Sequence, residues 1–182
     1  MRKIRKTALF AGPLVLLGLA ASAPAVVETG TVVKFRGIAG ANLGMSRAAV
    51  IAKLGPPLHQ SAFGVLSYSN KNILDVYLTR TGPKGRVRQV IASGSGFCAQ
   101  GVPAACSLKP GSVTAMTHAF PGKFRRVVDF TGDTIYWWCG RVRGRAVSTS
   151  FNADPKRHMI LTWYLTVRGA HCPTLTQVRN GT

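Results

Sequence analysis

The chain has 182 residues, of which 46% are hydrophobic and 8% aromatic, and its 24 basic side chains outnumber the 5 acidic ones for a formal charge of +19. This apolar and aromatic content excludes a disordered chain, and the length suits one ordinary domain or two small units. Five carboxylates leave few pairs for general acid–base catalysis, so we expect a binding protein and not an enzyme.

Residues 1–25 have the layout of a secretory signal peptide, with four basic side chains ahead of an uncharged run. Small residues at Ala23 and Ala25 suit a signal peptidase, and Pro24 disfavours cleavage directly before it, so we place the cut after Ala25. The alternative is an uncleaved anchor, although the run is shorter than the roughly 20 residues that span a bilayer. We therefore expect a chain of charge +15 that is secreted or associated with the cell envelope and has no membrane span.

Residues 26–97 are predicted to form a short helix followed by a meander of three strands. Ser46 can cap the helix, Val50 and Leu54 share one face of it, and Gly55 followed by two prolines ends it. The strands are VLSYS, ILDVYLT and RVRQVIA, joined by the turn sequences SNKN and GPKG.

Four cysteines in an exported chain indicate two disulfides. Three pairings are possible, and local spacing favours Cys98 with Cys106 and Cys139 with Cys172. A zinc site is the alternative, but the chain has no CxxC pair and only His171 adjoins a cysteine. We expect neither a metal nor a cofactor, and we interpret residues 98–107 as a linker loop closed by a disulfide.

Residues 108–172 repeat the same order of elements. Ser112 is the predicted helix cap, Met116 and Phe120 recur at helical spacing, and the strands DTIYWWC, GRAVSTSF and HMILTWYLTV follow. Residues 173–182 are predicted to form a C-terminal tail. The predicted fold class is therefore α+β, with two tandem lobes that each pack a short helix on one face of a three-stranded antiparallel meander.

The two helix motifs carry a resemblance to a known family. The first runs from Gly44-Met45-Ser46 to Leu54-Gly55-Pro56, and the second runs from Gly111-Ser112 to Phe120-Pro121. Over residues 38–172 the chain resembles the β-lactamase inhibitor protein family and the small outer-membrane assembly lipoproteins that share its helix-plus-meander unit. The motif residues are structural in that family. The resemblance implies a concave sheet surface, rich in aromatic residues, that grips a partner protein.

Aromatic side chains on the open faces of the sheets are the candidate partner-binding residues. In the strand ILDVYLT, apolar positions alternate with Asp75 and Tyr77, which places Tyr77 on the open face. Aromatic side chains bring contact area at a small loss of entropy, and therefore suit protein interfaces. The alternative is that they pack under loops or against the other lobe. The candidates are Tyr68, Tyr77, Tyr136, Trp138 and Tyr164.

Clustered basic residues are a second candidate site. One set alternates along a predicted strand and would lie on one side of it, and another follows the second helix. Because export makes nucleic acid an unexpected partner, the cations point to anionic wall polymer or membrane surface; the alternative is a basic surface that water alone contacts. These residues are Arg141, Arg143, Arg145, Lys123, Arg125 and Arg126.

We therefore expect an exported, noncatalytic protein-binding module with an inhibitor-like grip on an extracellular or envelope protein. The alternative is a basic protein of the cell envelope that binds anionic polymer or membrane by charge.

Overall fold

The computed structural model describes residues 23–129 and 131–179, so the predicted signal peptide lies outside the described residues except for its last three positions. Ala25 is half-buried, packs against the core and donates its backbone N–H to the carbonyl of Pro56 at 2.8 Å. Within the described part of the chain, no helix is long and apolar enough to cross a membrane.

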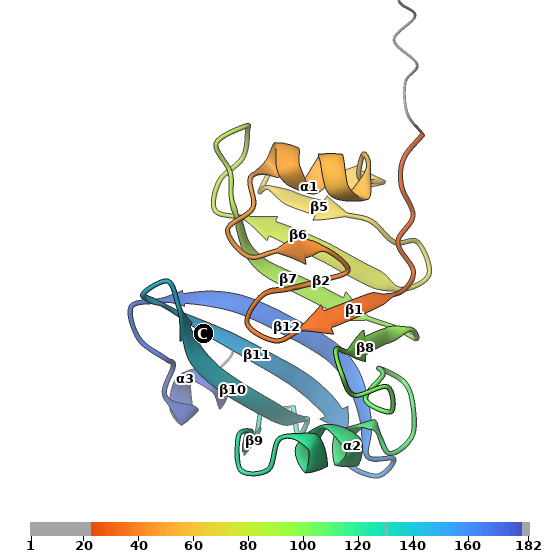
Figure 1. The fold of residues 1–182 in the computed structure, drawn as a ribbon, viewed down its shortest axis with the longest axis vertical. Helices are drawn as coiled ribbons and strands as arrows, with labels where there is room; N and C mark the ends of the chain where they lie inside the picture. Colours follow the sequence, from red (N-terminus) through yellow and green to blue (C-terminus); the bar gives the residue numbers. More distant parts are fainter. Residues whose placement is uncertain (1–22, 130, 180–182) are drawn as a thin grey trace, which may run out of the picture.

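The larger of two β-sheets has eight strands in the order β4-β5-β6-β7-β12-β11-β10-β9 (Figure 1). All neighbours in it are antiparallel. Its strands are β4 (His59–Gln60), β5 (Val65–Ser67), β6 (Ile73–Leu78), β7 (Val87–Ser93), β9 (Arg125–Val128), β10 (Thr134–Val142), β11 (Arg145–Asp154) and β12 (Met159–Gly169).

The smaller sheet has four strands in the order β3-β2-β1-β8, and β8 joins β1 in parallel. These strands are β1 (Gly30–Val33), β2 (Gly37–Ile38), β3 (Ala41–Asn42) and β8 (Phe97–Ala99). The described helices are α1 (Arg47–Leu54), α2 (Ser112–Ala119) and the short α3 (Leu175–Arg179).

The predicted fold class of two α+β lobes is wrong, because the chain is mostly β and its two meanders form one sheet. The six predicted meander strands are present, but β4 and β9 extend each meander to four strands. The last strands of the two meanders, β7 and β12, pair with each other, with Ile91 opposite Tyr164. This pairing satisfies backbone groups that two separate meanders would leave exposed at their edges.

The main core lies between the inner face of the large sheet and a layer made of α1, the small sheet and α2. Buried side chains from all of these elements belong to one cluster. Trp163 of β12 is fully buried in it, and its indole N–H donates to the carbonyl of Phe97 at 3.2 Å, which links the two sheets. Figure 1 shows α1 and α2 at opposite ends of the molecule, with the small sheet between them.

The two helices begin differently, although the sequence predicts a serine cap for both. The Ser46 hydroxyl accepts the backbone N–H of Ala49 at 3.2 Å, so the predicted cap of α1 is confirmed. At α2 the cap residue is Gly111, and the predicted cap Ser112 instead accepts the backbone N–H of Ile160 at 2.8 Å. Ser112 therefore links the start of α2 to the start of β12. The local spacing of residues does not predict this tertiary contact.

Both predicted disulfides are confirmed. Cys98–Cys106 closes the loop after β8, and Cys139–Cys172 ties the segment that follows β12 back to β10. The second disulfide holds the C-terminal residues, including α3, near β9 and β10.

The turn between β1 and β2 fastens the small sheet to the large one. Its tip, Phe35, has a positive φ of 57°, a conformation that costs a residue with a side chain on the order of 1 kcal/mol. Two contacts offset this cost: the backbone N–H of Phe35 donates to the Thr149 hydroxyl at 2.9 Å, and its ring meets Trp138 edge-on at 5.0 Å between centroids. The ring also passes so close to Gly140 that a Cβ there would lie 2.9 Å from it.

Phe35→Ala should lower the free energy of unfolding by about 2 kcal/mol, because it removes a half-buried ring from the contact between the sheets. Phe63→Ala is the matched control, since Phe63 is 87% exposed, and should change stability by less than about 0.5 kcal/mol. Urea denaturation of both variants measures the difference. Equal losses in the two variants would contradict the docking role of Phe35.

Candidate functional site

The outer face of the large sheet presents two of the predicted partner-binding residues. Tyr77 of β6 and Tyr164 of β12 lie on either side of β7, and Ile91 of β7 stands opposite Tyr164. All three side chains are half-buried on the face that points away from the core. Burial raises the pKa of both tyrosine hydroxyls, and like ordinary tyrosines they are protonated at neutral pH and can donate hydrogen bonds.

The outer face is covered at only one end. Among the described elements beside the sheet, α1, α2 and the small sheet all send their buried side chains into the main core, on the inner face. Helix α3 packs on the other side, where it contacts β9. There Trp137 is 3% exposed and Val178 of α3 is 7% exposed, and neither belongs to the main core. The part of the outer face formed by β5, β6, β7 and β12 stays free of any described helix.

The other three predicted aromatic residues do not lie on that face. Tyr68 has no exposed surface and is part of the main core, so a partner cannot contact it in the folded chain. Tyr136 stands opposite Phe151, and Trp138 stands opposite Thr149, on the inner face. The strand places Trp137, not Trp138, on the outer face, where the C-terminal segment buries it.

Trp138 instead belongs to an aromatic cluster on the inner face. Its ring contacts those of Phe35, Phe120 and Phe124 at centroid distances of 5.0, 5.6 and 5.7 Å. The Lys34 ammonium lies 4.2 Å from the Trp138 ring centre and 4.7 Å from that of Phe120. The sequence around Lys34 and Phe35 carries no motif, so neither residue could be predicted to belong to a site.

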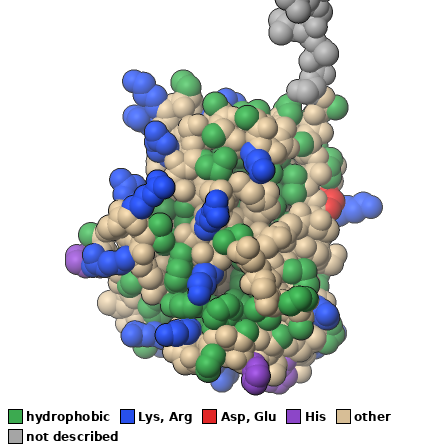
Figure 2. Space-filling model, in the orientation of Figure 1, with side chains coloured by type: hydrophobic (Ala, Val, Ile, Leu, Met, Phe, Trp, Pro, Cys, Tyr) green, Lys and Arg blue, Asp and Glu red, His purple; other side chains and the backbone are tan. Residues whose placement is uncertain are grey.

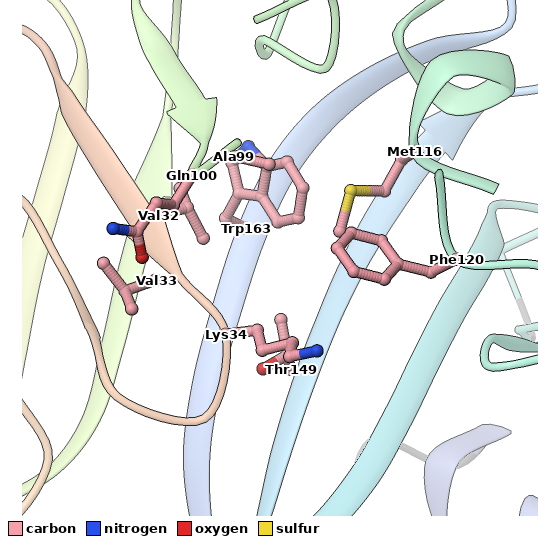
Figure 3. Close-up of a pocket in the computed structure, with 9 residues that line it drawn as sticks. All are labelled: Val32, Val33, Lys34, Ala99, Gln100, Met116, Phe120, Thr149 and Trp163. Atoms are coloured by element: carbon pink, nitrogen blue, oxygen red, sulfur yellow. The ribbon is translucent and has the colours of Figure 1, made fainter. Parts of the chain in front are cut away.

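Beside this cluster is a pocket of about 310 Å³ between the small sheet, α2 and the strands β11 and β12. In Figure 3 the Met116 and Phe120 side chains stand across the pocket from Val32 and Val33, Trp163 lies between the two sides, and Lys34 and Thr149 lie at one end. Its residues are Val32, Val33, Lys34, Ala99, Gln100, Met116, Phe120, Thr149 and Trp163.

The predicted basic residues are all exposed, but they do not form the predicted row along one strand. Arg143 and Gly144, both at positive φ, make the tight turn between β10 and β11. Arg141 of β10 stands opposite Ala146 of β11, and Arg145 is the first residue of β11. Together with Arg143 in the turn, these arginines surround the tip of the hairpin. The other cluster of Lys123, Arg125 and Arg126 lies at the start of the edge strand β9.

Most of the acidic side chains are half-buried at the surface and make local hydrogen bonds. They accept hydrogen bonds from neighbouring turns or strands, and bonds from Thr131 hold the pKa of Asp129 below its ordinary value. Figure 2 shows Lys and Arg side chains spread over one face among hydrophobic ones, with acidic side chains visible only at its right edge. The carboxylates that accept such hydrogen bonds are Glu28, Asp75, Asp129 and Asp154.

Among the described residues, no group of three or more His, Cys, Asp or Glu side chains could hold a metal ion. No protein-family model, curated protein or solved structure matches the chain. The resemblance to the β-lactamase inhibitor family therefore stays a prediction, as do the partner and the chemistry that it implies.

Tyr68→Phe should leave stability at pH 8 unchanged or slightly higher, because the buried Tyr68 hydroxyl has no hydrogen-bond partner among the described residues. Burial raises the pKa of Tyr68 to about 12, against an opposing effect from the charge of Arg47. Above pH 10 the unfolded chain loses this proton before the folded chain does, so the free energy of unfolding of the wild type falls as the pH rises from 10 toward 12.

Urea denaturation at pH 8 and pH 11 tests this assignment. The wild type should lose roughly 1 kcal/mol more than Tyr68→Phe between the two values. Equal losses, or a variant that is much less stable at pH 8, would show that the hydroxyl is not buried without a partner.

Proposed function

We propose that this chain is an exported, noncatalytic binding protein, and that the outer face of its large sheet contacts a protein partner. The observation that carries the proposal is the free part of that face, where Tyr164 lies beside Ile91, Tyr77 lies opposite Gln89 of the same strand, and no described helix covers them. Tyrosines provide apolar area with a polar tip, the combination that dominates the energetics of protein interfaces. The two disulfides support export, since such bonds persist in oxidising compartments.

A rigid sheet favours this function. Both tyrosines sit on strands with pairing partners on either side, so their backbone is already ordered before a partner arrives. Binding then costs little conformational entropy beyond the two side chains.

The double variant Tyr77→Ser, Tyr164→Ser should bind the partner at least about tenfold more weakly, because both contact side chains are truncated. The measurement is a quantitative pull-down with the chain from residue 26 onward, applied to the culture medium and envelope fraction of the organism that makes it. Phe63→Ser is the control, as it removes an exposed aromatic ring from a hairpin tip.

A captured protein that is lost with the double variant and retained with Phe63→Ser supports the proposal. The same set of captured proteins with all three baits, each shown to be folded by circular dichroism, would overturn it.

A second candidate function is binding of an anionic envelope surface by charge. It is favoured by the exposure of the six predicted cations and by the scarcity of carboxylates, with 5 acidic side chains against 24 basic ones. Within the described residues, the one ion pair joins Arg157 to Asp154 at 4.0 Å.

Replacing Arg141, Arg143 and Arg145 by glutamine should weaken adsorption to phosphatidylglycerol vesicles, and raised ionic strength should weaken it steeply for the wild type, because salt screens exposed charges. Vesicle co-sedimentation measures both effects. Adsorption that depends neither on salt nor on these arginines would count against this function, and would leave the tyrosine face as the better explanation.

A further inference from the structure

The pocket on the inner face of the large sheet has apolar walls and a polar rim. Met116 and Trp163 form part of its buried wall, and Val32 of β1 faces Met116 from the small sheet, with Trp163 between them (Figure 3). The volume of about 310 Å³ has room for about ten groups of the size of a water molecule, at about 30 Å³ each. Such a pocket suits a short chain of methylene groups and is too small for a folded partner.

The rim offers hydrogen-bond donors and one cation. Lys34 is exposed, and its ammonium lies over the rings of Phe120 and Trp138. No carboxylate among the described residues lies within 4.0 Å of its nitrogen. The ammonium is therefore held at the mouth of the pocket by rings, which do not neutralise its charge.

Thr149 lies below the rim at the same end of the pocket and has no exposed surface. Its oxygen accepts the backbone N–H of Phe35 at 2.9 Å. Since Phe35 follows Lys34 directly, this hydrogen bond also keeps Lys34 and Thr149 at the same end of the pocket, as Figure 3 shows. The amide of Gln100 also lines the pocket.

We propose that this pocket binds an anionic amphiphile with one short, unbranched apolar chain. The chain lies between the small sheet and the side chains of Met116 and Trp163, and the head group takes a charge-assisted hydrogen bond from Lys34 at the exposed end of the pocket. The site is separate from the proposed protein-binding surface, because it opens on the opposite face of the large sheet. Positive charge around the pocket also attracts an anion and repels a cationic amphiphile.

Decanoate is the probe, titrated into the chain from residue 26 onward below its micelle concentration and followed by isothermal titration calorimetry. We expect saturable binding of one molecule per chain. Hexanoate and octanoate should bind progressively more weakly, by about fourfold for each methylene removed. Decanol and decyltrimethylammonium, with the same chain and a neutral or cationic head, should bind at least about tenfold more weakly than decanoate.

Lys34→Gln and Arg36→Gln form a matched pair of variants. Both residues are exposed, both changes remove one positive charge, and only Lys34 lines the pocket. Lys34→Gln should weaken decanoate binding about tenfold, and Arg36→Gln less than about twofold. Val33→Phe, which adds bulk at the pocket wall, should abolish binding while the chain keeps its circular dichroism spectrum.

Absence of saturable binding by the folded wild type would overturn the proposal. Equal weakening by Lys34→Gln and Arg36→Gln would also overturn it, because the anion would then respond to overall charge and not to the pocket. Decanol binding as tight as decanoate would refute the role given to the rim.

Discussion

The pairing of β7 with β12 is the interaction on which the rest of this structure depends. It joins two meanders, each following its own short helix, into one sheet of eight strands. On the inner side it places Ala92 beside Trp163, so that both meanders share one core. On the outer side it places Ile91 beside Tyr164 and completes the surface that we propose as the binding face. Without this pairing, neither face would be continuous.

The two faces of the sheet have different chemistry because different elements cover them. The inner face receives α1, α2 and the small sheet, and the strained turn at Phe35 holds that layer against Trp138. The pocket is the space that remains between these layers. The outer face is covered by the C-terminal segment only near β9 and β10, where the Cys139–Cys172 disulfide anchors it. The disulfide thus keeps the C-terminal segment over β9 and β10, and the outer face of β5, β6, β7 and β12 is left uncovered by it.

Local features of the fold could be predicted from the sequence, because short-range chemistry determines them. The cap at Ser46, the alternation in β6 and both disulfides follow from neighbouring residues or from the export context. The joining of the meanders could not be predicted, since Ile91 and Tyr164 are far apart in sequence and no local signal selects that partner. The strands of the small sheet have only two to four residues, too few for a periodic pattern.

Only those site residues whose position depends on local alternation could be predicted from the sequence. Tyr77 follows a clean alternation and lies where expected, whereas the run IYWWC is apolar on both sides because β10 is covered on both faces at that point. The sequence therefore does not show which residues of this run face the core. The prediction that Trp138 lies on the open face is wrong, because Trp138 lies on the inner face. The spacing of Arg141, Arg143 and Arg145 resembles a strand, but Arg143 occupies a tight turn. Lys34 lies beside the pocket only because the small sheet packs on the large one, which brings its ammonium over Phe120 and Trp138.

Differential scanning calorimetry of the chain from residue 26 onward tests most directly whether both meanders form one sheet over one core. A shared core predicts a single transition whose calorimetric enthalpy equals the van't Hoff enthalpy. Two transitions, or a calorimetric enthalpy well above the van't Hoff value, would show that the two halves unfold independently and would contradict the continuous sheet.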